Sequence, residues 1–358
     1  MQTDLVIHFS VTFLAAAALS CFLTFLVRSV AVSLRIVDTP GEPRKIHGRP
    51  VPLLGGAALY ATILVVVAGL AQTGWLTDDR VSTRLLWGIV LAGAVIMLVG
   101  FLDDAFRLTW WQQMLGPILA VSIMIAAGLE IPFVTNPFGT GVLDLGEFFA
   151  GGMIVPTEGI LIFLWLLGMM YTTKLLDGVD GLASSISFVA TLVIFVVSLF
   201  WDHSGSTTSF LALTLAGAIL GFLVWNWHPA KIFLGEGGSI FLGFMLGVLA
   251  IISGGKIATA LLVMGVPILD VLWIIGRRLV SGQRIFSADK KHLHFRLLQA
   301  GMTQRQVALS LALVSLAFGS VSFVFGTRAK LIALAVLLVF MLGLALVLVR
   351  HEKKRGSI

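Results

Sequence analysis

Long apolar runs alternate with short polar segments along this 358-residue chain. Most runs have roughly 17 to 22 residues, the length at which an α-helix crosses about 30 Å of hydrocarbon. We identify eleven runs, with ten as the alternative because the fourth, fifth and eighth are short: 5–27, 53–73, 84–102, 114–130, 158–173, 182–200, 209–226, 239–252, 257–276, 307–325 and 331–349. The pattern predicts an all-α polytopic membrane protein.

The composition supports this prediction, because 58% of the residues are hydrophobic, only 12% are charged and the mean hydropathy is +1.03. No polar segment is long enough to bury a core of its own. We therefore expect a single integral membrane domain over residues 1–358, with its motifs in about 38–306 and two helices and a basic tail in 307–358. The start lacks the basic region of a signal peptide, so we expect a retained first span, with Cys21 inside it.

The distribution of positive charge predicts the topology. With the N-terminus outside and the C-terminus in the cytoplasm, 19 of the 24 Lys and Arg residues fall on the cytoplasmic side. The pI near 9.8 then reflects cationic loops beside anionic lipid, and we expect no nucleic-acid partner. The long outer connection, 130–159, is rich in Gly and Pro and has no Lys or Arg, which predicts short strands or turns.

The first inner loop concentrates positive charge between Pro and Gly residues. Arg44, Lys45, His47 and Arg49 lie within six residues. Cations beside small residues suit a phosphate-bearing group at the membrane surface. The alternative is a basic loop that serves only topology.

The second and third inner loops supply carboxylates. Asp103 and Asp104 are adjacent, so their charges repel unless a cation lies between them. Magnesium, bound by one or two carboxylates together with substrate phosphates, is the usual such cation. Asp177 and Asp180 are three residues apart and share a face on a helical turn, beside glycines that allow close approach of a ligand. For Asp103 and Asp104 the alternative is an exposed acidic turn. For Asp177 and Asp180 it is a Gly- and Asp-rich turn between two spans.

The fourth inner loop contains "FLGEGGS", which begins the eighth run. It supplies Phe233, Gly235, Glu236 and Ser239. A helix N-terminus that follows glycine can bind an anion, Glu236 could hold a metal, and Phe233 could stack on a base. The alternative is that the glycines only interrupt a helix.

The fifth inner loop contains "HLHFR". His292 and His294 would face one way on an extended segment, with Arg296 nearby. Zinc is disfavoured, because no cysteine or third histidine follows at ligand spacing, and phosphate or diphosphate fits the neighbouring cations better. The alternative is an amphipathic interfacial segment in which Phe295 and the two leucines at 297–298 contact lipid.

Asp270 lies inside the ninth run, close to its basic end. A carboxylate within a membrane is a candidate functional residue, and we expect Asp270 to support the inner loops. A transporter or channel that uses Asp270 is the alternative class. It is disfavoured because the outer halves of the runs have almost no polar residues to line a path.

Five successive inner loops thus supply acids, cations, histidines or glycine-rich turns, which predicts one polar site at the cytoplasmic membrane face. Their motifs run in the order DTP…RKIH…P.PLLGG, GF.DD, DGVDGLA, FLGEGGS.FLG and D.KHLHFRL, from about Asp38 to Gln306. This order resembles the polyprenyl-phosphate N-acetylhexosamine-1-phosphate transferase family, which includes MraY and the WecA/TagO enzymes. "RKIH" and "HLH" look more like the WecA/TagO branch.

The resemblance implies transfer of a sugar 1-phosphate, most simply GlcNAc-1-phosphate, from a UDP-N-acetylhexosamine to undecaprenyl or another polyprenyl phosphate, with release of UMP. It implies a multi-pass cell-membrane enzyme that starts envelope glycan synthesis with Mg²⁺, or alternatively Mn²⁺. An MraY-type phospho-MurNAc-pentapeptide transferase and a catalytically altered, ligand-binding relative are the alternatives. The oligomeric state stays open, a homodimer included.

The resemblance also implies roles for individual residues. The implied catalytic residues are Asp103, Asp104, Asp177, Asp180, His292 and His294; the implied metal ligands are Glu236 with Asp103 or Asp104; and the implied substrate contacts are Lys45, His47, Arg49, Lys174, Phe233, Gly235, Ser239 and Arg296. Asp103 is expected to assist the lipid phosphate as a base or by orienting it, and a covalent aspartyl phosphate is the alternative mechanism.

Three departures from the family pattern stand out. Tyr171 and Lys174 occupy positions where Asn is usual, Glu236 replaces an Asp, and Phe295 replaces a final His. Glu236 keeps its charge on a longer arm. Lys174 could contact a phosphate or pair with Asp177.

Overall fold

The computed structural model describes residues 2–41, 47–73, 76, 81–131, 133–135, 141–144, 157–201, 205–254, 257–282, 292–324 and 326–354. Its helices are α1 Gln2–Ser33, α2 Gly55–Gln72, α3 Thr83–Phe106, α4 Trp110–Ala126, α6 Thr157–Leu176, α7 Leu182–Trp201, α8 Thr207–Asn226, α9 Gly235–Ile252, α10 Ile257–Val263, α11 Gly265–Val280, α12 Leu293–Gln299, α13 Gln304–Val324 and α14 Thr327–Lys354. Its short strands are β1 Val37–Asp38, β2 Val51–Pro52, β3 Phe133–Thr135 and β4 Val142–Asp144.

Helices occupy all eleven predicted runs. Within the described residues, nine helices are long and apolar enough to cross a membrane. The fourth run is the 17-residue helix α4, and the ninth is divided into α10 and α11, which are bent by 78° at the break. The protein is therefore an all-α polytopic membrane protein with nine or ten clear spans in its described part.

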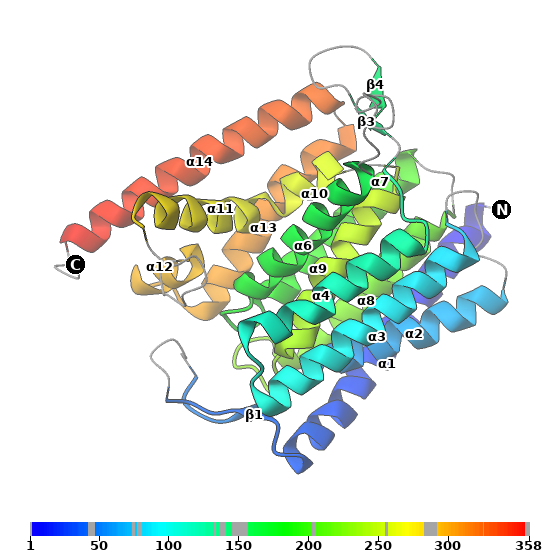
Figure 1. Cartoon of the computed structure of the whole chain (residues 1–358), viewed down its shortest axis with the longest axis horizontal. Coiled ribbons are helices and arrows are strands. Elements are labelled where there is room, and N and C mark those ends of the chain that lie inside the picture. Colours follow the sequence, from blue (N-terminus) through cyan, green and yellow to red (C-terminus); the bar gives the residue numbers. More distant parts are fainter. Residues whose placement is uncertain are drawn as a thin grey trace.

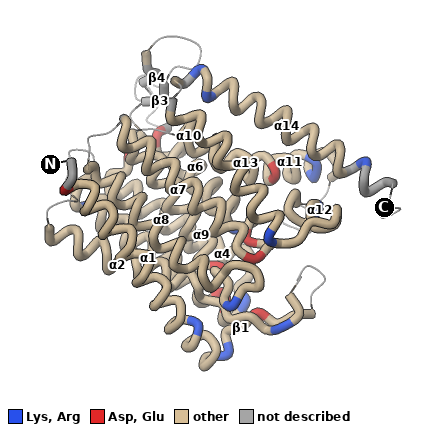
Figure 2. The backbone as a smooth tube through the Cα atoms, turned by 180° about the vertical axis from the view of Figure 1, so that it is seen from behind, with Lys and Arg blue, Asp and Glu red and all other residues tan. Residues whose placement is uncertain are grey.

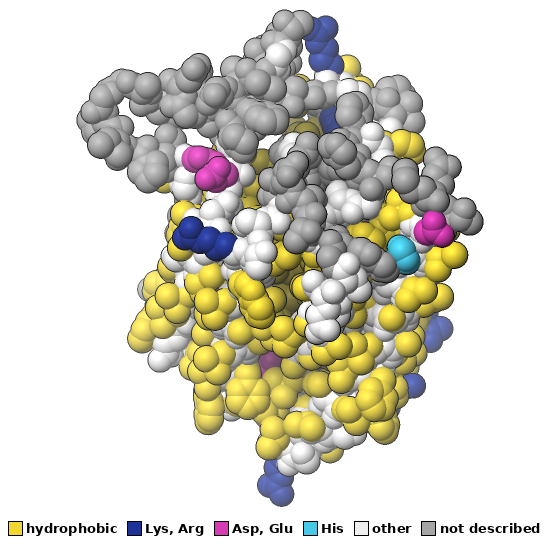
Figure 3. All heavy atoms as spheres, turned by 90° about the vertical axis from the view of Figure 1, so that its right-hand side faces the viewer, with side chains coloured by type: hydrophobic (Ala, Val, Ile, Leu, Met, Phe, Trp, Pro, Cys, Tyr) yellow, Lys and Arg dark blue, Asp and Glu magenta, His cyan; other side chains and the backbone are white. Residues whose placement is uncertain are grey.

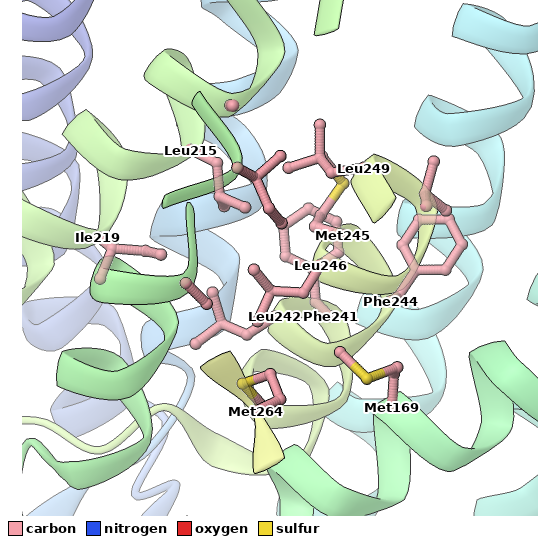
Figure 4. Close-up of a cluster of buried hydrophobic side chains, with 14 of the residues drawn as sticks. Met169, Leu215, Ile219, Phe241, Leu242, Phe244, Met245, Leu246, Leu249 and Met264 are labelled. Atoms are coloured by element: carbon pink, nitrogen blue, oxygen red, sulfur yellow. The ribbon is translucent and has the colours of Figure 1, made fainter. Parts of the chain in front are cut away.

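Helix α9 is the centre of the bundle. Its sequence is apolar on every side, as expected of a helix that neighbours enclose completely. In α9, all of which is described, every residue except Glu236 is buried. Helices α2, α3, α6, α7 and α8 pack around it. Figure 4 shows the Met, Leu and Phe side chains of this core on α9 and its neighbours.

The outer helices present apolar side chains to the surroundings. Figure 3 shows one face of the molecule, on which hydrophobic side chains form a broad band with charged groups mainly above and below it. In the most apolar 18-residue stretch of α14, only 17% is buried inside the protein. Large exposed apolar surface is costly in water and favourable in lipid, which agrees with a membrane location.

The two ends of the bundle differ. The β3–β4 pair lies at the end where the chain begins, and β1 and α12 lie at the opposite end (Figure 1). The β3–β4 pair confirms that part of the 130–159 connection forms short strands. Figure 2 shows Lys, Arg, Asp and Glu concentrated at the end that carries β1 and α12. This end contains the residues that the sequence marks as functional.

Candidate active site

The site is built around the N-terminus of α9, where two other helices approach very closely. A Cβ atom on Gly56 of α2 would overlap the backbone of Gly238, and one on Gly100 of α3 would overlap the backbone of Gly237. Small residues at such crossings let helix backbones come into contact. These crossings bring the C-terminal turn of α3 beside the first turn of α9.

Asp103 and Asp104 lie in that last turn of α3, and not in the loop after it as the span limits 84–102 suggested. One carboxylate oxygen of Asp104, Oδ1, accepts a hydrogen bond from the backbone N–H of Glu236 at 3.1 Å. Asp103 Oδ1 accepts from the backbone N–H of Leu108 at 2.7 Å and from Gln113 Nε2 at 3.1 Å. The acid pair is thus fixed between α9 and the start of α4.

Lys174 lies at the centre of the same group. Its ammonium contacts Glu236 Oε1 and donates to Gln113 Oε1 at 2.9 Å. The ring centre of Tyr171, one turn earlier on α6, is 5.5 Å from the Lys174 nitrogen. Lys174 therefore pairs with Glu236, whereas the sequence suggested a phosphate or Asp177 as its partner.

Asp177 and Asp180 have different surroundings, although both lie in the turn between α6 and α7. Burial, and then the neighbouring charges of Glu236 and Asp180, raise the pKa of Asp177 to about 7. Asp180 Oδ2 accepts from His228 Nδ1 at 2.7 Å and from the Ala230 N–H at 3.0 Å. Asp177 faces the acidic group, while Asp180 binds the connection that leads into α9.

The two histidines of the fifth inner loop lie with parallel rings. The ring centres of His292 and His294 are 5.6 Å apart and the planes differ by 8°. His292 Nδ1 is 2.8 Å from Asp270 Oδ2, so Asp270 does support this loop. His294 Nε2 is buried against Gly178, and the described residues give it no hydrogen-bond partner. Burial lowers the pKa of His294 to about 4, so its ring is neutral at pH 7.

The segment that carries these histidines is not extended. His292 is the N-cap of helix α12, and His294 is already inside the helix. Of the side chains that the interfacial alternative assigned to lipid, Leu297 is buried in the core and the half-buried Leu298 packs against it. The half-buried Phe295 contacts the His294 ring, so this helix is docked on the protein. Arg296 is half-buried on the same helix.

The first inner loop meets the start of α9 through His47 and Phe233. Their ring centres are 5.4 Å apart in an edge-to-face arrangement. His47 Nε2 is 3.0 Å from Asp38 Oδ2, and its Nδ1 is 2.8 Å from the carbonyl oxygen of the exposed Arg49. Lys45, expected here as a cation, lies outside the described residues.

Gly235 and Ser239 make packing contacts and hydrogen bonds within the first turn of α9. Gly235 has φ +74°, and a Cβ atom there would overlap the carboxylate of Asp104. Ser239 is buried, and its hydroxyl donates to the carbonyls of Gly235 and Glu236 at 3.3 and 3.1 Å. Glycine is therefore required at position 235 for Asp104 to pack closely. The Ser239 hydroxyl points back onto its own helix.

The acidic group fits a magnesium site that substrate completes. In the described part of the chain, no three His, Cys, Asp or Glu side chains form a ready metal cage. Mg²⁺ usually takes one or two protein carboxylates together with substrate phosphates. Glu236 and Asp104 match that donor set, because the hydrogen bond from the Glu236 backbone N–H to Asp104 holds both residues at one helix start, where their carboxylates are close enough to repel.

Comparison with known proteins agrees with this geometry. Residues 86–254 match the model of glycosyl transferase family 4. The chain is 31% identical over 350 residues, 96% of its length and 91% of the relative's, to a probable undecaprenyl-phosphate N-acetylglucosaminyl 1-phosphate transferase of Bacillus subtilis. The chain belongs to glycosyl transferase family 4. The resemblance drawn from the five motifs is therefore confirmed.

Other relatives extend the match. A decaprenyl-phosphate N-acetylglucosaminephosphotransferase of Mycobacterium leprae is 35% identical over 339 residues, covering 87% of this chain and 83% of the relative. An undecaprenyl-phosphate alpha-N-acetylglucosaminyl 1-phosphate transferase of Escherichia coli O157:H7 is 28% identical over 308 residues, with 83% and 78% covered. The named lipid differs among these relatives, whereas the transferred sugar is the same.

Two residues of this family 4 site were missed from the sequence. Gln113 links Asp103 to Lys174, and His228 links Asp180 to the connection before α9. A pair of glutamines just before an apolar run, in "WWQQMLG", was the available signal for Gln113. His228 lies in "NWHPAK", just before "FLGEGGS" in the fourth inner loop, and nothing in its spacing pointed to Asp180.

Proposed function

We propose that this chain transfers GlcNAc-1-phosphate from UDP-GlcNAc to a polyprenyl phosphate and releases UMP. The observation that carries the proposal is the convergence of Asp103, Asp104, Asp177, Glu236 and Lys174 at the start of α9. Acids and a cation at the end of a membrane bundle suit a reaction between a soluble diphosphate and a lipid phosphate. The named activities of the relatives support the same reaction.

The reaction is written as one displacement. An oxygen of the lipid phosphate forms a bond to the β-phosphorus of UDP-GlcNAc, and the bond from that phosphorus to the bridging oxygen breaks. UMP leaves with the bond electrons, and a lipid diphosphate sugar remains. A strong base is not required, because the second pKa of a phosphate monoester is near 6. The aspartyl-phosphate route stays the alternative.

The side chains then have separate roles. Asp103, held by Leu108 and Gln113, orients the lipid phosphate. Phe233 and His47, at the mouth of the first loop, contact the uridine. His292, held by Asp270, contacts a phosphate oxygen as a hydrogen-bond donor, and the neutral, buried His294 packs beside it against Gly178. Mg²⁺, when bound by Glu236 with Asp104, supplies positive charge that offsets the diphosphate.

We place this chemistry at the cytoplasmic face of the plasma membrane. Nineteen of the 24 Lys and Arg residues belong to the loops and tail at that end in the topology with an outside N-terminus. The nucleotide sugar is a cytoplasmic compound in this proposal, and the apolar helices hold the lipid acceptor at the same membrane surface.

The test is release of labelled UMP from UDP-GlcNAc by purified protein in detergent with Mg²⁺. We expect release only when undecaprenyl or decaprenyl phosphate is added, and comparison of the two lipids gives the acceptor preference. Asp103→Asn and Asp104→Asn should each lower kcat by about 100-fold or more at saturating Mg²⁺. Near-normal turnover in both variants would contradict the carboxylate roles.

Two alternatives are outcomes of the same assay. Release from UDP-MurNAc-pentapeptide but not from UDP-GlcNAc would show an MraY-type enzyme. No release from any UDP-N-acetylhexosamine, by protein with an intact thermal transition, would favour a ligand-binding relative that has lost activity.

A further inference from the structure

Lys174 closes a ring of polar contacts that joins four helices. Its ammonium contacts Glu236 Oε1 on α9 and Gln113 Oε1 on α4. Gln113 in turn donates to Asp103, and the Glu236 N–H donates to Asp104, both on α3. Lys174 itself lies in the last turn of α6. A side chain in this position is fixed by contacts on two sides.

The ion pair is shielded from solvent. The side chains of Lys174 and Glu236 are 20% and 17% exposed. A hydrogen bond between charged groups in such a place is stronger than a surface ion pair, because less water competes for either partner. The ammonium therefore neutralises a carboxylate that the acidic neighbours would otherwise repel.

Glu236 is also a carboxylate to which the proposed function assigns the divalent cation. A lysine ammonium and a metal ion on the same carboxylate repel each other, so each weakens the hold of the other on Glu236. We propose that the Lys174 ammonium is a resident counter-ion that competes with the divalent cation for Glu236. This inference rests on the proposed function only for the presence of a metal, and it concerns Lys174 itself.

The side chain of Lys174 is suited to such a displacement. Lysine carries its charge on a flexible four-carbon stem, so the ammonium can leave Glu236 without movement of α6. Gln113, a neutral amide, holds the nitrogen by a single hydrogen bond at 2.9 Å. Loss of the Glu236 contact thus opens the carboxylate while the helices stay packed.

The experiment measures metal binding directly. Purified, metal-free protein in detergent is titrated with Mn²⁺ alone, and free Mn²⁺ is followed by electron paramagnetic resonance. Lys174→Gln should bind Mn²⁺ about tenfold more tightly than the unmodified chain, the effect of losing one charged hydrogen bond. Lys174→Arg keeps the charge and should bind as weakly as the unmodified chain.

The matched control is Lys231→Gln, which removes an exposed lysine at the same end of the bundle. It should change Mn²⁺ affinity less than twofold, because the charge of an exposed lysine is screened by solvent and salt. In a double-mutant cycle, the gain from Lys174→Gln should disappear in a Glu236→Gln background. A gain that persists there, or unchanged affinity in Lys174→Gln, would overturn the proposal.

A second measurement needs no variant. Acetylation of lysines by a brief pulse of acetic anhydride is quantified by mass spectrometry with and without Mn²⁺. Release of Lys174 from Glu236 should increase its modification severalfold, while Lys231 stays unchanged. Equal or lower modification of Lys174 in the presence of Mn²⁺ would contradict displacement. Neither measurement includes UDP-GlcNAc or lipid phosphate, so failure of the transfer assay leaves this inference testable, and the reverse also holds.

Discussion

At the scale of single residues, Asp180 shows how a carboxylate in a motif can serve the geometry of its neighbours. It binds His228 and the Ala230 N–H, and its own N–H donates to Gln304. We expect Asp180→Ala to lower stability by about 1–3 kcal/mol, because two partly buried donors lose their acceptor. The check is the thermal unfolding midpoint in detergent, together with KM for UDP-GlcNAc, which should rise as the connection before α9 loosens.

The matched variant for Asp180 is Arg305→Gln. Arg305 Nε donates to the backbone carbonyl of His228 at 2.9 Å from an exposed position, so its loss should cost much less. If Asp180→Ala kept both the unfolding midpoint and KM but abolished kcat, Asp180 would act on the reacting groups and not on the loop.

His294 predicts a dependence of stability on pH. Burial lowers its pKa to about 4 in the folded protein, against an ordinary value of 6.5. Between these values the unfolded chain binds a proton that the folded chain does not, so stability is present above pH 6.5 and is lost as pH falls toward 4. The slope from this one group is at most about 1.4 kcal/mol per pH unit.

His294→Gln should flatten the fall of the unfolding midpoint between pH 6.5 and 4, whatever its effect at pH 7. His8→Gln, near the start of α1, is the control for loss of a histidine elsewhere in the chain. An identical acid limb in His294→Gln and the unmodified chain would contradict the assignment.

At the scale of helices, the glycine crossings with α9 position the acids. A Cβ on Gly100 would overlap the backbone of Gly237, so Gly100→Ala must push α3 away from α9. We expect a cost of about 1–3 kcal/mol from overpacking. Transfer activity should fall by tenfold or more, since Asp104 then loses its register with Glu236. UMP release and the unfolding midpoint measure the two effects.

Gly168→Ala is the control for this crossing. Gly168 lies on an exposed face of α6, and nothing is within 4 Å of the Cβ that alanine would add. Because alanine is the better helix former, this variant should be neutral or slightly stabilising. Equal losses in Gly100→Ala and Gly168→Ala would show that the crossing has no special role.

The elements differ in how far the sequence predicts them. Most spans could be predicted, because lipid demands long apolar helices and nine of the eleven runs are single helices long and apolar enough to cross a membrane in the described residues. The depth of Asp103 and Asp104 could not be predicted, since α3 continues to Phe106, past the end of the predicted run at Leu102. The Lys174–Glu236 pair joins residues far apart in the chain, and its existence depends on how α6 and α9 pack. The bend between α10 and α11 likewise has no local signal that fixes its angle.

At the scale of the whole molecule, charge asymmetry and site position agree. The acidic group, α12 and the β1–β2 pair lie at one end, and the β3–β4 pair lies at the other (Figures 1 and 2). A site built from five separate loops at a single end requires each loop to return to the same membrane surface. The proposed chemistry therefore requires that all five loops face the cytoplasm, and this orientation can be tested by itself.

Single cysteines report the orientation. In a Cys21→Ser background, which removes the only native thiol, Lys231→Cys places a thiol at the site end and Arg328→Cys places one at the start of α14. Both native residues are exposed. A membrane-impermeant maleimide added to intact cells should label position 328 and not 231, and inverted vesicles should give the reverse. Labelling of 231 from outside would place the site on the wrong surface for a cytoplasmic nucleotide sugar, and the proposed donor would have to be abandoned.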